Sequence, residues 1–303
     1  MQVSTVGIKM FKLVLGLGNN SLQEIEGLCE IYALAGANIF DLSPDVNSLL
    51  AAQNGVKRAG LDPCDFKYCI SFGVKGDKHI KKAQINTKKC SACRNCAEVC
   101  PQEAIEVPKV AIERCIGCLK CADVCVFEAI DFFDFETDIV KTAAEFKAIG
   151  APDLVELHIS SFDKEQIFKA WDEILANFDC RKSICIDRSK YGNIELLKLV
   201  RALISKNPEK TIIQADGVPM SGSKGALSTL QALAHAQLYQ NLDAHIFISG
   251  GTNEETGRLA REFGLRYEGI TIGSYARSAV KNLSREEKIK TAKKIVKSAI
   301  LVK

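Results

Sequence analysis

Short apolar runs alternate with longer amphipathic segments along most of this chain. The runs are rich in aliphatic and β-branched side chains, as expected for strands that are buried on both faces. They lie at residues 11–17, 38–42, 67–74, 154–159, 182–187, 210–216, 244–249 and 269–273. The segments between them place apolar residues three and four positions apart, which predicts helices.

The predicted helices follow the runs in turn. They span residues 22–35, 45–59, 138–149, 164–177, 193–205 and 224–240. Two more are expected at capping boxes, one opened by Thr252 and Glu255 and one by Ser284 and Glu287. Ser21 is positioned to cap the first helix.

Alternating strands and helices indicate a parallel sheet. Eight repeats of this unit predict a closed (β/α)8 barrel. An open, doubly wound α/β sheet remains the alternative, because strand order cannot be read from periodicity.

One segment after the third run breaks this pattern with a repeated cysteine motif. The spacing C-x2-C-x2-C-x3-C occurs twice, at Cys90, Cys93, Cys96 and Cys100, and at Cys115, Cys118, Cys121 and Cys125. The flanking sequence repeats too, since AEVCPQEAI at 97–105 returns as ADVCVFEAI at 122–130. This is the spacing of a bacterial ferredoxin that holds two [4Fe–4S] clusters.

In this motif the fourth cysteine of each copy ligates the other cluster. We therefore expect one cluster on Cys90, Cys93, Cys96 and Cys125, and the second on Cys115, Cys118, Cys121 and Cys100. A zinc site would use isolated pairs of cysteines, and a disulfide framework is typical of short secreted chains. Val126 takes the place of the proline in the second copy, a change expected to affect loop rigidity and not ligation.

The motif predicts two domains. Residues 84–133 form the ferredoxin domain, and residues 1–83 and 134–303 form a discontinuous barrel domain. The insertion follows the third strand, and loops after strands line the face of a barrel that carries its functional sites. The clusters are therefore expected close to the mouth of the barrel.

The loops after the last two strands are rich in small residues, namely Gly250, Gly251, Thr252, Gly273 and Ser274. In barrels this pair of loops often binds a phosphate through backbone N–H groups. The predicted ligand is flavin mononucleotide (FMN) or another phosphate-bearing molecule, and ordinary turns are the alternative. Polar side chains also stand at strand ends, at Asn19, Asp41, Lys75, His158, Asp187, Gln214 and Asp216, but no nucleophile–base pair emerges from them.

Composition places few further limits on function. A net charge of +3 gives no reason to expect nucleic acid binding. Neither a signal peptide nor an apolar run long enough to span a membrane is seen, so a cytoplasmic location is expected. The lysine-rich segment 284–303 is read as the last barrel helix, with peripheral membrane contact as the alternative.

The sequence also resembles the light-dependent period modulator family, ferredoxin-containing redox inputs to the cyanobacterial circadian clock. The resemblance rests on the double cluster motif and on FKLVLGLGNN at 11–20, YALAGANIFDLS at 32–43, QADGVPMSG at 214–222, SGGTNEET at 249–256 and IGSYAR at 272–277. It implies a redox-responsive iron–sulfur protein that reports to a partner, and it implies no known catalytic reaction.

Two functional hypotheses follow. In the first, the protein is a redox sensor or electron-transfer protein with a redox or regulatory partner. In the second, it is an oxidoreductase whose clusters pass electrons to a phosphate-bearing cofactor or substrate in the barrel. Whether the protein is an enzyme stays open at this point.

Overall fold

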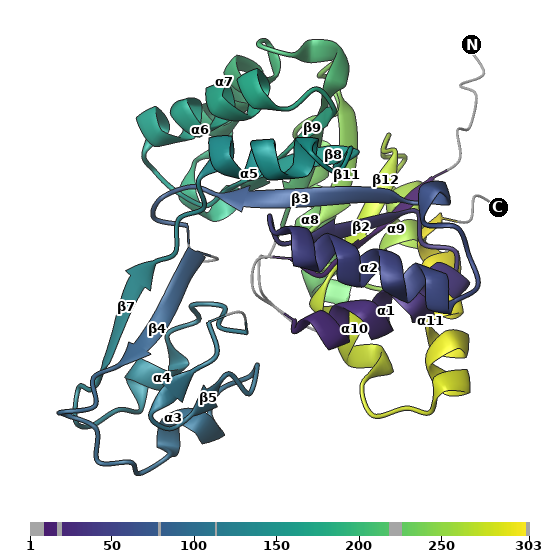
Figure 1. The fold of residues 1–303 in the computed structure, drawn as a ribbon. Coiled ribbons are helices and arrows are strands. Elements are labelled where there is room, and N and C mark those ends of the chain that lie inside the picture. The colour runs from purple at the N-terminus through teal and green to yellow at the C-terminus, as the bar shows by residue number, and fades with distance from the viewer. Residues whose placement is uncertain (1–8, 17–19, 78–79, 113, 218–225, 301–303) are drawn as a thin grey trace, which may run out of the picture.

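The computed structural model describes residues 9–16, 20–77, 80–112, 114–217 and 226–300. Eight parallel strands close a barrel in the order β1-β12-β11-β10-β9-β8-β3-β2 (Figure 1). They are β1 (Met10–Val14), β2 (Ile39–Leu42), β3 (Lys67–Gly73), β8 (Leu154–Ile159), β9 (Arg181–Asp187), β10 (Thr211–Asp216), β11 (His245–Ser249) and β12 (Gly269–Ile272). All eight predicted strands are confirmed, and the pairing of β1 with β12 excludes the open sheet.

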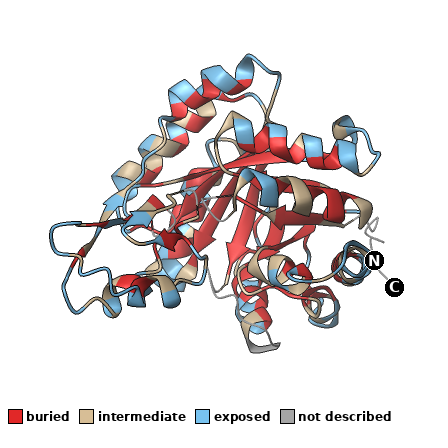
Figure 2. Ribbon diagram, turned by 60° about the horizontal axis from the view of Figure 1, so that its bottom comes forward, coloured by how far each residue is buried: buried red, intermediate tan, exposed pale blue. Residues whose placement is uncertain are grey.

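Helices surround this barrel. They are α1 (Leu22–Leu34), α2 (Val46–Arg58), α5 (Ile139–Lys147), α6 (Lys164–Asn177), α7 (Asn193–Ile204), α8 (Ala226–Gln237), α9 (Thr256–Glu262), α10 (Ser274–Val280) and α11 (Arg285–Ile300), with 3-10 turns η1 (Pro63–Asp65), η3 (Arg188–Lys190) and η4 (Pro208–Lys210). Figure 2 shows the strands almost wholly buried and the helices buried on one side. Of the α-helices named here, α10 was not predicted from the sequence. Among the described residues, no helix is long and apolar enough to cross a membrane.

Two of the predicted helix starts have the expected caps. Ser21 accepts from the backbone N–H of Glu24, whose carboxylate accepts from the backbone N–H of Ser21 at 2.7 Å. Ser284 and Glu287 make the same reciprocal pair before α11. Each cap satisfies N–H groups that the first turn of a helix leaves without partners.

The predicted capping box at Thr252 is wrong. The hydroxyl of Thr252 is buried and donates to the carbonyl oxygen of Thr271 in β12 at 2.5 Å. Helix α9 begins later, after Glu255, which makes no side-chain cap. A tertiary hydrogen bond to the neighbouring strand has replaced the local one.

The barrel interior changes from apolar to polar along the strands. Its amino-terminal end is an apolar layer of Ile39, Leu154, Ile212 and Phe247, and Cys69 lies between this layer and the polar one above it. Above it, towards the carboxyl ends of the strands, buried polar side chains fill the barrel, among them Lys12, Asp41, Glu156, His158, Gln214 and Asp216. Polar side chains that could bind a ligand are thus concentrated at the carboxyl end of the barrel.

The cysteine-rich segment forms a separate lobe after β3, as predicted from the sequence. It is reached through β4 (Lys81–Ile85) and left through β7 (Ile130–Asp134), which pair antiparallel. The lobe also holds α3 (Asn95–Glu98), α4 (Lys120–Asp123), β5 (Ile105–Glu106) and β6 (Lys109–Val110). In Figure 1 it lies beside the barrel, beyond the carboxyl end of β3.

Candidate functional site

The backbone of the lobe repeats with the sequence. Helices α3 and α4 each follow a residue in the left-handed conformation, Arg94 with φ of 71° and Leu119 with φ of 70°. Two further pairs with the same spacing share positive φ values, Ala92 with Gly117 and Glu103 with Glu128. The two motif copies therefore present their cysteines on loops of the same shape.

The two copies enclose two small hollows of equal size, about 20 Å³ each. One hollow is lined by Cys90, Cys93, Cys96 and Cys125. The other is lined by Cys100, Cys115, Cys118 and Cys121. The fourth cysteine of each motif thus crosses to the other hollow, which is the grouping expected from the sequence. Four soft thiol ligands around a hollow fit an iron–sulfur cluster.

Backbone N–H groups point at four of these sulfur atoms. The donors and acceptors are Ala92 to Cys90 at 3.4 Å, and Ala104 to Cys100, Ala129 to Cys125 and Ala83 to Cys115, each at 3.3 Å. Such hydrogen bonds stabilise negative charge on sulfur and raise the reduction potential of a bound cluster. The lobe therefore offers ligands and also tunes their charge.

The two hollows differ in their electrostatic surroundings. The ammonium of Lys82 is buried and donates to the carbonyl oxygen of Cys115 at 2.6 Å, on the rim of the second hollow. Burial, together with neighbouring Cys115 and Cys118, raises the pKa of Cys121 to about 11. Because iron binds the thiolate, cluster assembly at this hollow must release protons.

The first hollow opens toward the surface. Cys93 is exposed, and so is Phe127 in the lining of this hollow, by 47%. Val126, which follows Cys125 in the chain, is exposed by 81%. Val126 stands where the first copy has Pro101, and its exposure shows that the core of the lobe does not depend on it. Electron exchange with another protein is easiest where a ligand meets solvent.

Inside the barrel, Lys12 sits at the centre of a buried polar layer. Its Nζ lies 3.1 Å from Asp41 Oδ2, 2.6 Å from Glu156 Oε2 and 3.1 Å from Gln214 Oε1. Burial raises the pKa of Asp41 to about 6, against the opposing effect of Lys12. Burial also opposes the charge of Lys12, but the carboxylates Asp41 and Glu156 outweigh it and raise its pKa.

Neighbouring side chains complete this layer. Glu156 also accepts from Ser183 at 2.8 Å and from the amide of Gln214 at 3.0 Å. Thr271 donates to Gln214, and Ser71 donates to Asp41. These side chains bond to one another in a connected network, which accounts for the burial of so many polar groups in this layer.

A second polar cluster lies one layer closer to the carboxyl ends of the strands. His158 Nδ1 lies 2.5 Å from Asp77 Oδ2, and its Nε2 lies 3.5 Å from Asp216 Oδ2. The thiol of Cys185 lies beside His158 and accepts from the Gln214 amide at 3.2 Å. Burial opposes the charge of His158, but Asp77 and the other neighbours raise its pKa.

The polar residues expected at strand ends divide into two sets. The barrel interior buries Asp41, His158, Asp187, Gln214 and Asp216. Lys75 is exposed, and Asn19 lies outside the described residues. Asp77, in the turn after β3, and Cys185 were not predicted as site residues from the sequence. Cys185 could have been found from the alternation of β9, which turns Ser183, Cys185 and Asp187 to one face.

The predicted phosphate loops have other neighbours in the structure. At Gly251, where φ is +82°, a Cβ atom would lie 2.9 Å from the carbonyl oxygen of Ser228, so close packing on α8 accounts for this glycine. Gly250 also has a positive φ, and the Thr252 hydroxyl is bonded to Thr271. A Cβ on Gly273 would lie 3.4 Å from Val14. Phosphate binding by these two loops therefore remains a prediction.

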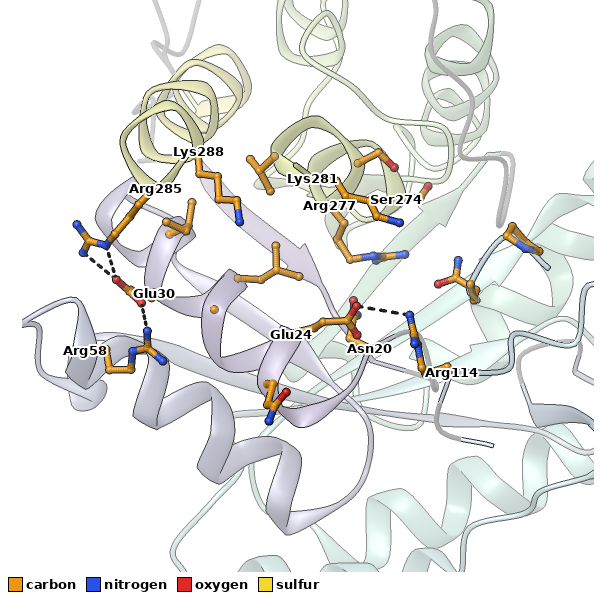
Figure 3. Close-up of a pocket in the computed structure, with 18 residues that line it drawn as sticks. Asn20, Glu24, Glu30, Arg58, Arg114, Ser274, Arg277, Lys281, Arg285 and Lys288 are labelled. Carbon is orange, nitrogen blue, oxygen red and sulfur yellow. Dashed lines mark hydrogen bonds and ion pairs between the residues drawn. The ribbon is translucent and has the colours of Figure 1, made fainter. Parts of the chain in front are cut away.

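Ser274 belongs to a different feature, a cavity of about 470 Å³ between the barrel and the lobe. Among the described residues, its lining includes Ser274 but not Gly250, Gly251 or Thr252. Six basic residues line it, Arg58, Arg114, Arg277, Lys281, Arg285 and Lys288, against the acidic Glu24 and Glu30. We call it the basic cavity. Figure 3 shows Arg277 and Lys288 reaching into the space between α1, α10 and α11.

The acidic residues neutralise only part of this charge. Glu30 pairs with Arg285 at 2.7 Å and with Arg58 at 3.2 Å, while Glu24 lies 3.8 Å from Arg114. Arg277 donates to the carbonyl oxygen of Val14 at 2.6 Å, and burial lowers its pKa to about 10. The excess positive charge suits an anion.

Two cysteine-lined hollows on a lobe inserted in a (β/α)8 barrel define an iron–sulfur-binding barrel protein. The comparison with known families agrees. Residues 87–136 match the LdpA Fe-S cluster-binding domain, and residues 148–300 match the Light dependent period A C-terminal domain. The chain belongs to the Light dependent period A family, which confirms the resemblance noted in the sequence.

A curated relative supports this assignment. The chain is 27% identical over 289 residues to Light dependent period A of Synechococcus elongatus, covering 90% of this chain and 81% of that protein.

Solved structures share the barrel. An aminoacrylate- and BRD0059-bound tryptophan synthase from Mycobacterium tuberculosis has a TM-score of 0.52 at 8% identity, covering 98% of this chain and 94% of the other. A truncated 3-deoxy-D-arabino-heptulosonate 7-phosphate synthase from Thermotoga maritima has a TM-score of 0.50 at 9% identity, covering 98% of this chain and 88% of the other. At such low identity these similarities concern the fold alone.

Proposed function

We propose that this protein carries two [4Fe–4S] clusters and works as a redox sensor or electron-transfer protein. The observation that carries the proposal is the division of eight cysteines into two hollows, with the fourth cysteine of each motif exchanged. One cluster is held by Cys90, Cys93, Cys96 and Cys125, the other by Cys115, Cys118, Cys121 and Cys100. All described cysteines are free thiols, which suits a reducing, cytoplasmic compartment.

The contacts between lobe and barrel suggest how a redox change is reported. Glu103 pairs with Lys281 of the barrel at 3.1 Å, and Arg114 faces Glu24 of α1 at 3.8 Å. Glu103 is three residues from Cys100, and Arg114 precedes Cys115, so both pairs start beside ligands of the second cluster. Exposed ion pairs contribute at most about 1 kcal/mol each. A one-electron change in cluster charge can therefore alter these ion pairs between lobe and barrel. A regulatory partner that binds the two arrangements differently would then respond to the redox state.

The domains follow from the same observation. The expected ferredoxin bounds, 84 and 133, fall inside β4 and β7, which pair along their whole length. We therefore extend the proposed cluster domain to both whole strands, with the barrel domain on either side. The lobe can then hold its clusters on a small core of its own.

The test is an anaerobic purification with iron and sulfide analysis. About eight irons per chain are expected for two cubane clusters. Cys118→Ala should disturb one cluster and leave the far-ultraviolet dichroism of the barrel unchanged, whereas Cys64→Ala, at an exposed cysteine outside the lobe, should keep the full iron content. A stoichiometry of about four irons, or zinc in place of iron, would contradict the proposal.

The basic cavity favours a second candidate function, an oxidoreductase in which the clusters pass electrons to a phosphate-bearing cofactor such as FMN. Pro101 and Gln102, which follow Cys100, line this cavity, so an anion bound there would lie close to the second hollow. FMN titration followed by flavin fluorescence tests the idea. Arg277→Gln and Lys288→Gln should weaken binding, and Lys290→Gln, at an exposed position outside the cavity, should not. Absence of flavin binding to the intact protein would exclude FMN.

A further inference from the structure

We propose that His158, Cys185 and Asp216 form a binding site for a divalent transition metal of the zinc class at the carboxyl end of the barrel. The three residues stand near the ends of the adjacent strands β8, β9 and β10. This site uses none of the cluster cysteines, so the proposal is independent of the iron–sulfur function.

The strand register brings the three side chains together. His158 pairs directly with Cys185 across β8 and β9, and both side chains point into the barrel. Asp216 ends β10, and its Oδ2 lies 3.5 Å from His158 Nε2. One nitrogen, one sulfur and one oxygen atom lie within 4.8 Å of one another, all on buried residues. Small movements of side chains suffice to place them around one ion.

The histidine is oriented as in protein metal sites. Asp77 Oδ2 lies 2.5 Å from His158 Nδ1, which leaves Nε2 facing Cys185 and Asp216. A histidine that ligates a metal usually donates its other N–H to a carboxylate in this way. The amide of Gln214 also donates to the sulfur of Cys185, an interaction that stabilises a thiolate.

The adjacent layer provides a comparison within the same barrel. Asp41, Cys69 and Glu156 also bring three potential ligand atoms within 4.8 Å of one another. The ammonium of Lys12 occupies that layer, 3.1 Å from Asp41 and 2.6 Å from Glu156. Its positive charge is therefore supplied by the chain, and no metal is needed there.

In the upper cluster the neighbouring carboxylates favour a proton on His158, because they raise its pKa against the effect of burial. Two carboxylates, Asp77 and Asp216, and the Cys185 thiol surround this one imidazole. A metal ion can replace that proton and the thiol proton, and it would balance the buried negative charge. The same ligand atoms serve either cation.

The donor atoms select the class of metal. Nitrogen, sulfur and oxygen ligands together suit zinc, and a thiolate disfavours magnesium and calcium. Three protein ligands leave one position of a tetrahedral site for water or for an oxygen atom of a small molecule. The site is therefore of the open type.

Elemental analysis of the cluster-loaded protein tests the proposal. The protein is equilibrated anaerobically with Zn²⁺, and excess ion is removed by gel filtration. One zinc per chain is expected beyond the cluster iron. Cys185→Ser and His158→Gln should each lose this zinc, whereas Cys69→Ser, in the lysine-filled layer, should keep it. Asp77→Asn should keep the three ligands but weaken zinc binding by about 10- to 100-fold.

Cobalt supplies a second readout. Co²⁺ in the same site should give a sulfur-to-cobalt absorption band in the difference spectrum, and Cys185→Ser should abolish that band. The far-ultraviolet dichroism and iron content of each variant check that it is folded and loaded. The proposal is overturned if the wild-type protein binds no zinc, or if folded Cys185→Ser and His158→Gln retain it.

Discussion

Lys82 and Cys115 are joined by a buried hydrogen bond, from the lysine ammonium to the cysteine carbonyl oxygen at 2.6 Å. This places a buried ammonium beside the second hollow. We expect Lys82→Met to lower the reduction potential of a cluster bound at that hollow by tens of millivolts, since about 1.4 kcal/mol corresponds to about 59 mV for one electron. A redox titration followed by electron paramagnetic resonance measures it.

The control for this prediction is Lys81→Met. Lys81 lies on the same strand, is partly exposed and pairs with Asp134 at 3.3 Å. Its loss should leave both potentials nearly unchanged. Equal shifts in the two variants would show that the effect is one of overall charge and not of the buried ammonium.

Lys12→Met should strongly destabilise the barrel. The change leaves Asp41 and Glu156 buried without their cation, and breaking a buried ion pair in this way typically costs about 3–5 kcal/mol. Chemical denaturation measures the free energy of unfolding. Adding Glu156→Gln should recover part of the loss, because one buried charge is removed, and a double variant no more stable than the single one would argue against this explanation.

Stability should fall in mild acid because of His235. Burial lowers the pKa of this histidine to about 4, from about 6.5 in an unfolded chain. The folded state therefore favours the neutral ring, so its contribution is full above pH 6.5 and is lost as the pH falls towards 4. This group alone should reduce the free energy of unfolding by about 2 kcal/mol between pH 8 and pH 5.

His235→Gln should remove that part of the pH dependence, as denaturation at several pH values would show. Tyr239→Phe gives the matched comparison, since the tyrosine hydroxyl lies 2.7 Å from His235 Nε2. Its loss should destabilise the protein by about 1–3 kcal/mol at neutral pH. If His235→Gln keeps the wild-type profile, another group is responsible.

Gly251→Ala should destabilise the barrel more than Gly264→Ala. Both glycines have positive φ, but only at Gly251 would a new Cβ meet Ser228, at 2.9 Å. The conformation alone costs about 1–2 kcal/mol, and overpacking adds about 1–3 kcal/mol. Thermal unfolding of the two variants separates these effects. Equal losses would mean that the loop moves freely away from α8.

Much of the fold could be predicted because its strands are buried on both faces. Short runs that are mostly apolar, such as 154–159 and 244–249, indicate strands, and eight of them with intervening helices predict a closed barrel. The cysteines line the two hollows in the groups that the motif predicts, while their role as cluster ligands stays a prediction.

Other features depend on contacts between distant segments, which a sequence does not show. The Thr252 hydroxyl donates to the carbonyl oxygen of Thr271 instead of capping a helix, and the local sequence around Thr252 does not predict this hydrogen bond. The pairing of His158 with Cys185 needs the register of two strands, and Asp77 joins them from a turn. The basic cavity gathers side chains from α1, α2, α10, α11 and the lobe, so it exists only once the chain has folded.

The paired strands β4 and β7 have a consequence for how the barrel closes. Strand β3 must pair with β8 across about 80 intervening residues, and the entropic cost of closing a loop grows with the logarithm of its length. A folded lobe joins its own two ends, which shortens the effective loop to roughly 26 residues and reduces that cost by about 1 kcal/mol. A folded cluster-binding domain thus stabilises the barrel by holding the two ends of the insertion together. Unfolding of this domain would lower the free energy of unfolding of the barrel through chain entropy alone.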